Sequence, residues 1–416
     1  MIKLNFDIKK HKLDNNLEVI TIKKDTRIGA INIGFNIGSM HEKENEKGVS
    51  HFVEHMLFKG TTNLNNEELN SELESLGGEY NAYTDYETTV YTISCLEEEL
   101  ENGTRLLADM VINSDFNKEE IEKERSVILA ELRTGKDDIE DLSFKKTNEA
   151  AFSKGFLRWE VIGTEKNVNN FKRDDIVEYF SKYYVPGNAV ITLVTSLDHE
   201  DAVDMVKKYF KDWKDKSFSK IEPVKEKNKK LRKVSYKDDI EQSTIIYLYT
   251  FDDLKRNEEL PLRILNHRLG ESSNSILFRE VRENRGYAYD IFTHLDISND
   301  SKNLYIYTSV SDDDVEKTEE VINEIIEKVV NGQISFENRD LEIMKKVHKT
   351  AVISTLEDSA ELCNYILHQA LSKEDLLEFV YDMERLNKIE KEEISEIGKK
   401  VFKDATIHIL RKSEEE

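Results

Sequence analysis

Cysteine and proline are scarce in this chain, which has two cysteines and three prolines among 416 residues. Cys95 and Cys363 stand alone in different halves of the sequence, which argues against a disulfide framework. With so few prolines, long helices are expected. No run of about 18 apolar residues is present, which argues against a membrane span, and the first residues lack the apolar stretch of a signal peptide. The sequence therefore favours a cytoplasmic protein.

Acidic residues outnumber basic ones, 84 to 60, and the formal net charge is −24. A charge of this sign disfavours binding to a nucleic-acid backbone. It would suit basic peptide substrates if part of the acidic excess lines a cavity, although most of it is expected on solvated surface.

The length of the chain exceeds that of one comfortable core and predicts two domains. A charged stretch with little apolar periodicity lies near the middle, so we expect an N-terminal domain at 1–215, a linker at 216–232 and a C-terminal domain at 233–416. Both halves read as strands followed by helices, an α+β pattern that occurs twice. The expected strands lie near 28–37, 189–194, 243–249 and 304–310, and the expected helices near 67–76, 100–112, 315–330 and 341–352.

The segment His51-Phe52-Val53-Glu54-His55 carries the strongest chemical signal. In a helix, four residues bring His51 and His55 about one turn apart on the same face. Two neutral imidazoles at this spacing can bind one Zn²⁺, and Glu54 is free to take a proton from water, which is the HxxEH arrangement. Apolar residues continue the expected helix to Phe58, and Gly60 ends it. A structural alternative makes both histidines core residues with Glu54 as their ionic partner.

A catalytic zinc site requires a third protein ligand, and the best candidates lie in residues 119–132. Ile121, Ile128 and Leu132 recur at helical spacing, so this segment is predicted to be an amphipathic helix whose buried stripe includes Val127. Glutamates are abundant here, and most glutamates on a helix are simply solvated. Spacing alone does not choose among the four candidates, Glu120, Glu122, Glu124 and Glu131.

These motifs resemble the inverzincin zinc peptidases that include pitrilysin, insulin-degrading enzyme and the mitochondrial processing peptidase, above all their short bacterial members. The family's second block, ERxVIxxE, is matched by residues 124–131. The resemblance implies that Glu131 is the third zinc ligand and that Glu124 assists the site. Ala130 stands where family members often have Glu, and the Pro-Leu-Gly usual before residues 161–165 is absent.

Further matches imply how a substrate would be held. Residues 77–91 resemble the family's substrate-binding strand, so Asn81 and Ala82 are expected to pair with an extended peptide through main-chain hydrogen bonds. Arg282 and Tyr289, seven residues apart, match an Arg and a Tyr that hold substrate and stabilise the oxyanion formed on attack. Phe58, one turn beyond His55, is expected to line the pocket beside the cleaved bond.

The resemblance implies two similar α/β sandwich domains, each an antiparallel or mixed sheet covered by helices, arranged as a clam shell. It implies a zinc metalloendopeptidase that cleaves peptides or unfolded segments inside an enclosed chamber, with Zn²⁺ as cofactor, peptides as substrates and a homodimer as the assembly. Two alternatives stay open: a non-catalytic or partner subunit of a heteromeric peptidase, and a maturation protease dedicated to one secreted peptide. Neither nucleic acid nor membrane is an expected partner.

Overall fold

The computed structural model describes residues 4–334 and 337–413, which form two compact units. The first unit contains residues 1–133, 160–223 and 352–379, and the second contains residues 134–159, 224–351 and 380–416. The expected division at 1–215, 216–232 and 233–416 treats each half as one continuous segment, whereas each unit is built from three. Those boundaries stay a prediction, but residues 213–230, which include most of the expected linker, have no helix or strand.

A six-stranded mixed sheet forms the centre of the first unit, in the order β1-β2-β6-β3-β5-β4. All neighbouring strands are antiparallel except β2 and β6. Every residue of β6 is buried, and its β-branched side chains suit a central strand. The strands are β1 (Phe6–Lys12), β2 (Glu18–Lys24), β3 (Ile28–Phe35), β4 (Glu79–Thr84), β5 (Thr89–Leu96) and β6 (Ala189–Thr195).

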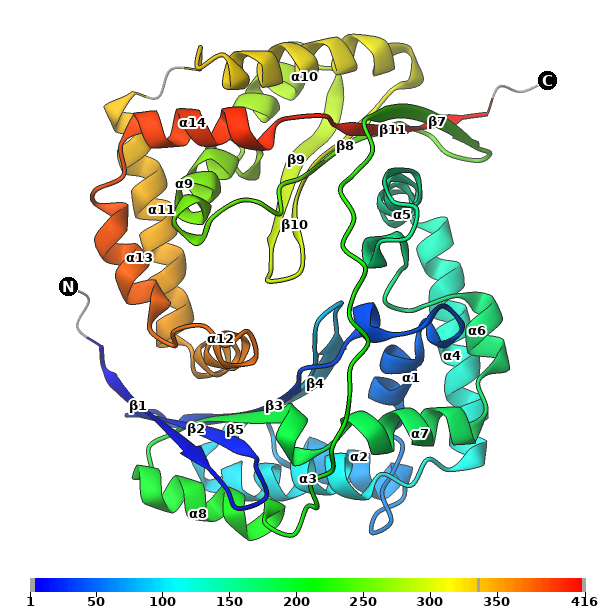
Figure 1. Cartoon of the computed structure of the whole chain (residues 1–416), viewed down its shortest axis with the longest axis vertical. Helices are drawn as coiled ribbons and strands as arrows, with labels where there is room; N and C mark the ends of the chain where they lie inside the picture. The colour runs from blue at the N-terminus through cyan, green and yellow to red at the C-terminus, as the bar shows by residue number, and fades with distance from the viewer. Residues whose placement is uncertain (1–3, 335–336, 414–416) are drawn as a thin grey trace. The chain divides into compact units, whose positions relative to one another are not determined.

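Helices cover both faces of this sheet (Figure 1). Helices α3 and α8 pack on one face, and α12 packs on the other against β3 and β6. The helices of the first unit are α1 (Val49–Met56), α2 (Asn66–Ser75), α3 (Leu100–Asn113), α6 (Glu165–Asn170), α7 (Arg173–Tyr183), α8 (His199–Phe210) and α12 (Ser359–Leu371), together with most of α4 (Lys118–Asp137).

The second unit contains a five-stranded mixed sheet in the order β7-β11-β8-β10-β9, with β7 and β11 parallel. Its strands are β7 (Leu231–Lys237), β8 (Ser243–Thr250), β9 (Ala288–Ile297), β10 (Lys302–Val310) and β11 (Thr406–Lys412). Its helices are α5 (Ile139–Ala151), α9 (Arg256–Asn266), α10 (Val315–Val330) and α14 (Lys391–Val401), with most of α11 (Asn338–Glu357) and α13 (Glu378–Leu386).

Each unit takes one helix from the other half of the sequence. Helix α5 follows α4 in the chain, yet it packs against β8 and β11 of the second unit. Helix α12 belongs to the C-terminal half but packs in the first unit, where the Thr192 hydroxyl donates to the carbonyl of Cys363. The two units therefore share a design, a mixed sheet covered by helices, and the fold class expected from the sequence is confirmed.

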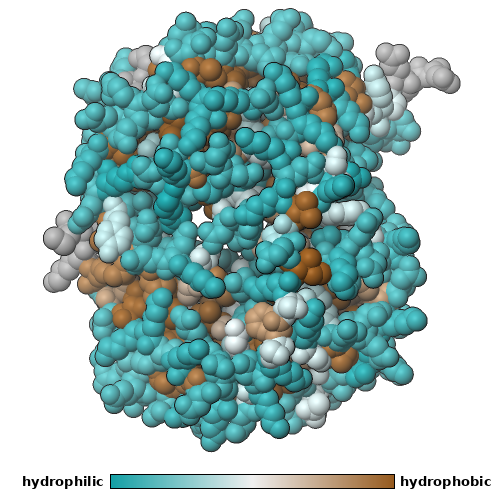
Figure 2. Space-filling view, in the orientation of Figure 1, coloured by the Kyte–Doolittle hydropathy of each residue, from teal (hydrophilic) through white to brown (hydrophobic). Residues whose placement is uncertain are grey.

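The elements expected from periodicity form close to their predicted ranges, with two differences. Helix α1 ends at Met56 rather than continuing to Phe58, and Gly60 follows with a φ of +118°. Val127 does not belong to a buried stripe, because it is 48% exposed while Ile128 is buried. The face drawn in Figure 2 is mostly hydrophilic with scattered apolar patches, in keeping with the 35% of charged residues. Among the described residues, no helix combines the length and the apolar character that crossing a bilayer requires.

Candidate metal centre

Helix α1 carries the HxxEH residues on the side that faces away from the core. Its apolar residues Phe52, Val53 and Met56 are fully buried, which fixes the orientation of the helix. His51, Glu54 and His55 are partly exposed. The N-cap residue of the helix is Gly48, whose φ is +99° and whose missing Cβ lets the backbone of residues 162–163 approach closely. A helix packed in this way holds its imidazoles rigidly.

Helix α4 brings Glu131 to the two imidazoles. Ile121, Ile128 and Leu132 of α4 are buried in the core of the first unit, and Glu131 lies at the edge of this buried face. The Glu131 carboxylate oxygens lie 3.8 Å from His51 Nε2 and 3.7 Å from His55 Nε2. One ligand atom from each of the three residues lies within 4.8 Å of the others. Among the described residues, no other group of three or more His, Cys, Asp or Glu side chains comes together in this way.

The donor set fits zinc. Ligands bound at about 2.1 Å in a tetrahedron stand about 3.4 Å apart, close to the separations seen here. Two imidazole nitrogens and one carboxylate are the ligands of a known type of catalytic zinc site, which leaves one position for water. The three side chains are therefore suited to hold a zinc ion.

Glu124 supports His55 from behind. His55 Nδ1 lies 3.0 Å from Glu124 Oε2, and with Nδ1 as donor the Nε2 lone pair is left free to bind a metal. Lys59 Nζ lies 2.8 Å from the other Glu124 oxygen. Burial acts to raise the pKa of Glu124, but the hydrogen bonds from His55 and Lys59 outweigh it and hold that pKa below its ordinary value. Burial likewise acts to lower the pKa of His55, but Glu124 and the other nearby carboxylates raise it overall.

His51 has a less polar environment. Burial, and after it the neighbouring His55, lowers the pKa of His51 to about 3. Its Nδ1 atom is buried, and no group among the described residues forms a hydrogen bond with it. His51 is therefore neutral at physiological pH, which is the form of imidazole that binds a metal.

Glu54 stands beside the three ligands and is not one of them. The hydroxyl of Thr84, at the end of β4, donates to Glu54 Oε2 at 2.6 Å. Burial raises the pKa of Glu54, although the Thr84 hydrogen bond acts in the opposite direction. A carboxylate whose pKa is raised is a stronger base, and the second oxygen of Glu54 is left for proton transfer.

The expected substrate-binding residues of the first unit lie close to α1. Helix α1 packs against β4, which is an edge strand because it pairs with β5 alone. Asn81 and Ala82 lie in the middle of β4, and Asn81 is exposed. The Asn81 side chain accepts a hydrogen bond from the Ala82 backbone N–H at 2.9 Å. Phe58 is partly buried, with its ring 6.4 Å from that of Tyr80.

Arg282 and Tyr289 lie next to each other in the second unit. Arg282 belongs to a π-helical turn, Phe278–Glu283, and Tyr289 belongs to β9. The Arg282 guanidinium lies 5.2 Å from the Tyr289 ring and 4.7 Å from the Phe278 ring, distances typical of cation–π contacts. Tyr289 is 72% exposed. Their role toward a substrate stays a prediction.

Two family models match the chain. The model described as insulinase (peptidase family M16) matches residues 18–165, and the model described as the peptidase M16 inactive domain matches residues 170–346. A protein of Rickettsia felis named as an uncharacterized zinc protease is 32% identical over 338 residues, which are 79% of this chain and 80% of that protein. The chain belongs to peptidase family M16. The resemblance drawn from HxxEH and ERxVIxxE is thereby confirmed.

Two further similarities agree with this assignment. Human mitochondrial-processing peptidase subunit beta is 30% identical over 200 residues, which are 48% of this chain and 41% of that protein. The crystal structure of a protease from Helicobacter pylori superposes with a TM-score of 0.90 at 23% identity, over 97% of this chain and 99% of that one. This second likeness shows that the two proteins share a fold.

Sequence reasoning missed two residues of this M16 site, Lys59 and Thr84. Lys59 reaches Glu124, 65 positions further along the chain, and Thr84 reaches Glu54 from a neighbouring strand. Lys59 follows His55 by four residues in a segment with a helical pattern. This spacing could have placed its positive charge on the same side as the imidazole of His55. No comparable signal marks Thr84, because a threonine at a strand end is ordinary.

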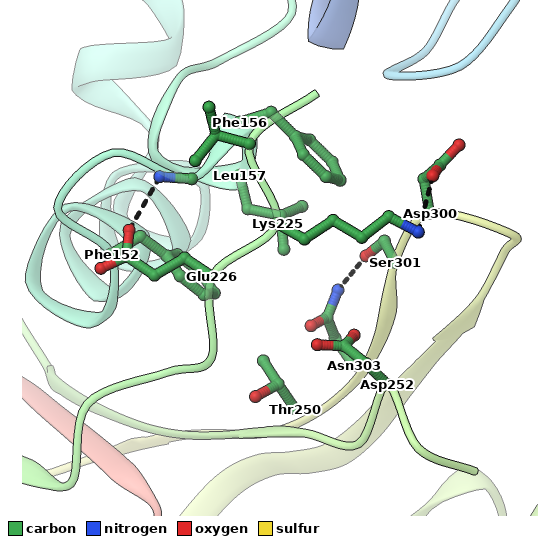
Figure 3. Close-up of a pocket in the computed structure, with 12 residues that line it drawn as sticks. Phe152, Phe156, Leu157, Lys225, Glu226, Thr250, Asp252, Asp300, Ser301 and Asn303 are labelled. Atoms are coloured by element: carbon green, nitrogen blue, oxygen red, sulfur yellow. Dashed lines mark hydrogen bonds and ion pairs between the residues drawn. The ribbon is translucent and has the colours of Figure 1, made fainter. Parts of the chain in front are cut away.

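A separate pocket lies in the second unit (Figure 3). Its lining includes Phe152, Asp252 and Asn303, with Lys225 paired to Asp300 at 2.8 Å. One Glu226 oxygen accepts the backbone N–H groups of residues 153, 154 and 155, at 2.8, 2.7 and 2.8 Å. The pocket has neither His nor Cys in its lining, so it lacks the imidazole ligands found on α1.

Proposed function

We propose that this chain is a zinc-dependent endopeptidase that hydrolyses peptides or unfolded segments of proteins. One observation carries the proposal: His51, His55 and Glu131 present three ligand atoms within 4.8 Å, and Glu54 lies beside them with its pKa raised by burial. The M16 family and its zinc protease relatives supply the reaction class.

The ligands and the base have separate roles. His51, His55 and Glu131 would hold zinc, which when bound lowers the pKa of a water ligand and polarises a carbonyl. The Glu54 carboxylate accepts a proton from the water whose oxygen forms the new bond to the scissile carbon. It then delivers that proton to the amine nitrogen as the C–N bond breaks. The Thr84 hydroxyl keeps Glu54 in place during both transfers.

Residues beyond the ligands would hold the peptide. The exposed edge of β4 at Asn81 and Ala82 offers main-chain groups to an extended chain, which favours broad sequence tolerance. Arg282 and Tyr289 carry donors suited to a peptide carbonyl and to an oxyanion. Phe58 would contact the side chain next to the cleaved bond.

Replacement of Glu54 by Gln tests the proposal. Glu54→Gln keeps the shape of the side chain and the three ligands but removes the base. We expect one zinc per chain in both proteins, and a loss of cleavage of a mixed peptide library by about 10²- to 10⁴-fold in the variant. Glu67→Gln, an exposed position on α2, is the matched control and is expected to retain activity. Unchanged cleavage by Glu54→Gln would overturn the proposal.

The same library experiment separates the two narrower alternatives. A wild-type chain that binds zinc but cleaves nothing by itself would favour a partner subunit of a heteromeric peptidase. Cleavage of one peptide alone would favour a dedicated maturation protease. Pairing of two copies and an enclosed chamber stay predictions of the family resemblance, and a cytoplasmic location stays a prediction from the sequence. Sedimentation of the purified chain tests the pairing.

A further inference from the structure

Glu42 is a buried carboxylate at the start of the helix that carries HxxEH. It is 4% exposed and lies just after a short 3-10 turn, Ser39–His41. Its Oε1 accepts hydrogen bonds from the Ser50 backbone N–H at 2.7 Å and from the Ser50 hydroxyl at 2.6 Å. Its Oε2 accepts the Gly48 backbone N–H at 2.9 Å. Three donors therefore converge on one side chain.

Helix α1 depends on this carboxylate because its own first residue cannot cap it. The N-cap residue is Gly48, which has no side chain, and the first turn of a helix leaves backbone N–H groups without partners. Glu42 supplies acceptors for two of them from six and eight residues upstream. Both N–H groups are buried, so an acceptor for each avoids the cost of an unsatisfied donor at the start of the helix.

The contact continues from Glu42 to a second helix. Ser50 Oγ, which donates to Glu42, lies 2.7 Å from the Tyr179 hydroxyl of α7. Helices α1 and α7 pack against each other. Lys47 adds a buried positive charge near Glu42 and donates from Nζ to the Ser39 carbonyl at 2.8 Å. The chain Glu42–Ser50–Tyr179 thus fixes both the start of α1 and its position against α7.

We propose that Glu42 is a positioning residue of the metal centre: it holds the first turn of α1, and through it His51, in the place that zinc binding requires. The inference rests on the proposed function. His51 directly follows Ser50, whose backbone N–H and hydroxyl both bond to Glu42. Helix α1 has only eight residues, so a shift of its first turn moves one ligand relative to the other and to Glu131.

Glu42→Gln is the decisive variant, and Glu226→Gln is its matched control. Both oxygens of the Glu42 carboxylate accept hydrogen bonds, and in Glu42→Gln one of them is replaced by an NH₂ group, which cannot accept. At least one hydrogen bond to the start of α1 is therefore lost. Glu226 likewise accepts three backbone N–H groups with its carboxylate, but it lies in the second unit (Figure 3). Both variants lose hydrogen bonds to backbone, and only one of them lies next to a proposed zinc ligand.

The measurements are zinc affinity by competition with a chromophoric chelator, the visible absorption of the Co²⁺-loaded protein, and the kcat and KM of peptide cleavage. In Glu42→Gln we expect zinc affinity or kcat to fall about 10- to 100-fold with KM little changed, because distortion at the metal affects the reacting geometry. The Co²⁺ absorption bands are expected to shift. Glu226→Gln is expected to leave all of these at wild-type values.

The outcomes separate the inference from the proposed function. A wild-type chain that binds zinc but cleaves no peptide overturns the function, whereas zinc affinity and the Co²⁺ spectrum still test Glu42. An active wild type together with a Glu42→Gln variant of unchanged affinity, spectrum and kcat overturns the inference. If Glu42→Gln does not fold, Tyr179→Phe is the second variant, because it removes one hydroxyl from the hydrogen-bonded series Glu42–Ser50–Tyr179. It is expected to shift the Co²⁺ bands, and an unshifted spectrum overturns the inference.

Discussion

His55 Nδ1 and Glu124 Oε2 lie 3.0 Å apart, so a carboxylate holds the side of the imidazole opposite to Nε2, the atom proposed to bind zinc. Glu124 is nearly buried, and its second oxygen is paired with Lys59. The carboxylate fixes the ring orientation of His55 and makes its Nε2 a stronger donor to a metal. Glu131, by contrast, has 49% of its side chain exposed, so the two histidines of α1 are the more buried members of the group.

Glu124→Gln is expected to weaken zinc binding by about 10- to 100-fold, because the amide carries no charge to stabilise the bound imidazole. Competition with a chromophoric chelator measures the affinity. Glu119→Gln, an exposed position in the first turn of the same helix, is the control and is expected to bind zinc as tightly as wild type. Equal affinities for the two variants would contradict a supporting role for Glu124.

Lys59→Met is expected to weaken zinc binding by less than Glu124→Gln does, because Lys59 acts through the Glu124 carboxylate. The double variant is therefore expected to bind zinc no more weakly than Glu124→Gln alone, since the pair acts as one unit. The same competition assay on wild type, the two single variants and the double variant measures how far their effects add. Additive losses would show that Lys59 acts on the centre by another route.

Tyr289→Phe is expected to lower kcat/KM by about 10²- to 10³-fold, the usual effect of removing one oxyanion donor. The phenyl ring preserves the surface on which the Arg282 guanidinium stacks, so the change is confined to the hydroxyl. Zinc affinity is expected to stay at the wild-type value, because all three proposed ligands belong to the first unit. Tyr287→Phe, two residues before Tyr289, is the control. Full activity of Tyr289→Phe would show that the Tyr289 hydroxyl has no part in the reaction.

The centre was predictable from sequence where its residues are local. HxxEH gives two imidazoles one helical turn apart, and α1 places them so. Helical spacing puts Glu124 and Glu131 on one face, but it does not choose among four glutamates, and the choice of Glu131 came from the family resemblance. Val127 shows the limit of the pattern, because this apolar residue next to the buried Ile128 is half exposed.

Long-range contacts were beyond the reach of the sequence. Glu42 reaches α1 from outside the helix, and Thr84 reaches Glu54 of α1 from strand β4. Periodicity predicted the strands and most helices, since each pattern depends on near neighbours. It does not indicate which sheet a helix covers, so the exchange of α5 and α12 between the two halves was not foreseen.

The stability of the protein is expected to depend on pH through Glu42. Burial raises its pKa from 4.5 to about 7, despite the hydrogen bonds from Ser50 and Gly48. The folded chain then binds more protons than the unfolded chain between these values. The contribution of Glu42 is therefore fully present below pH 4.5 and is lost as pH rises through 7, by about 3 kcal/mol at most. Urea unfolding of wild type and Glu42→Gln is expected to show a difference in stability that falls over this range, and a constant difference would contradict the shift.

Leu367→Ala on α12 is expected to destabilise the first unit, although residue 367 belongs to the C-terminal half of the sequence. Leu367 is fully buried, and its side chain fills the space above Gly34 of β3. The loss is expected to be about 2–5 kcal/mol, the usual cost of a leucine-sized cavity. Hydrogen exchange measured by mass spectrometry is expected to show faster exchange in β3 and β6 and unchanged exchange in β8 and β11. Leu197→Ala, at a position 38% exposed, is the control and is expected to cost less. If β8 and β11 lost protection instead, α12 would be stabilising the second unit, and the prediction would be wrong.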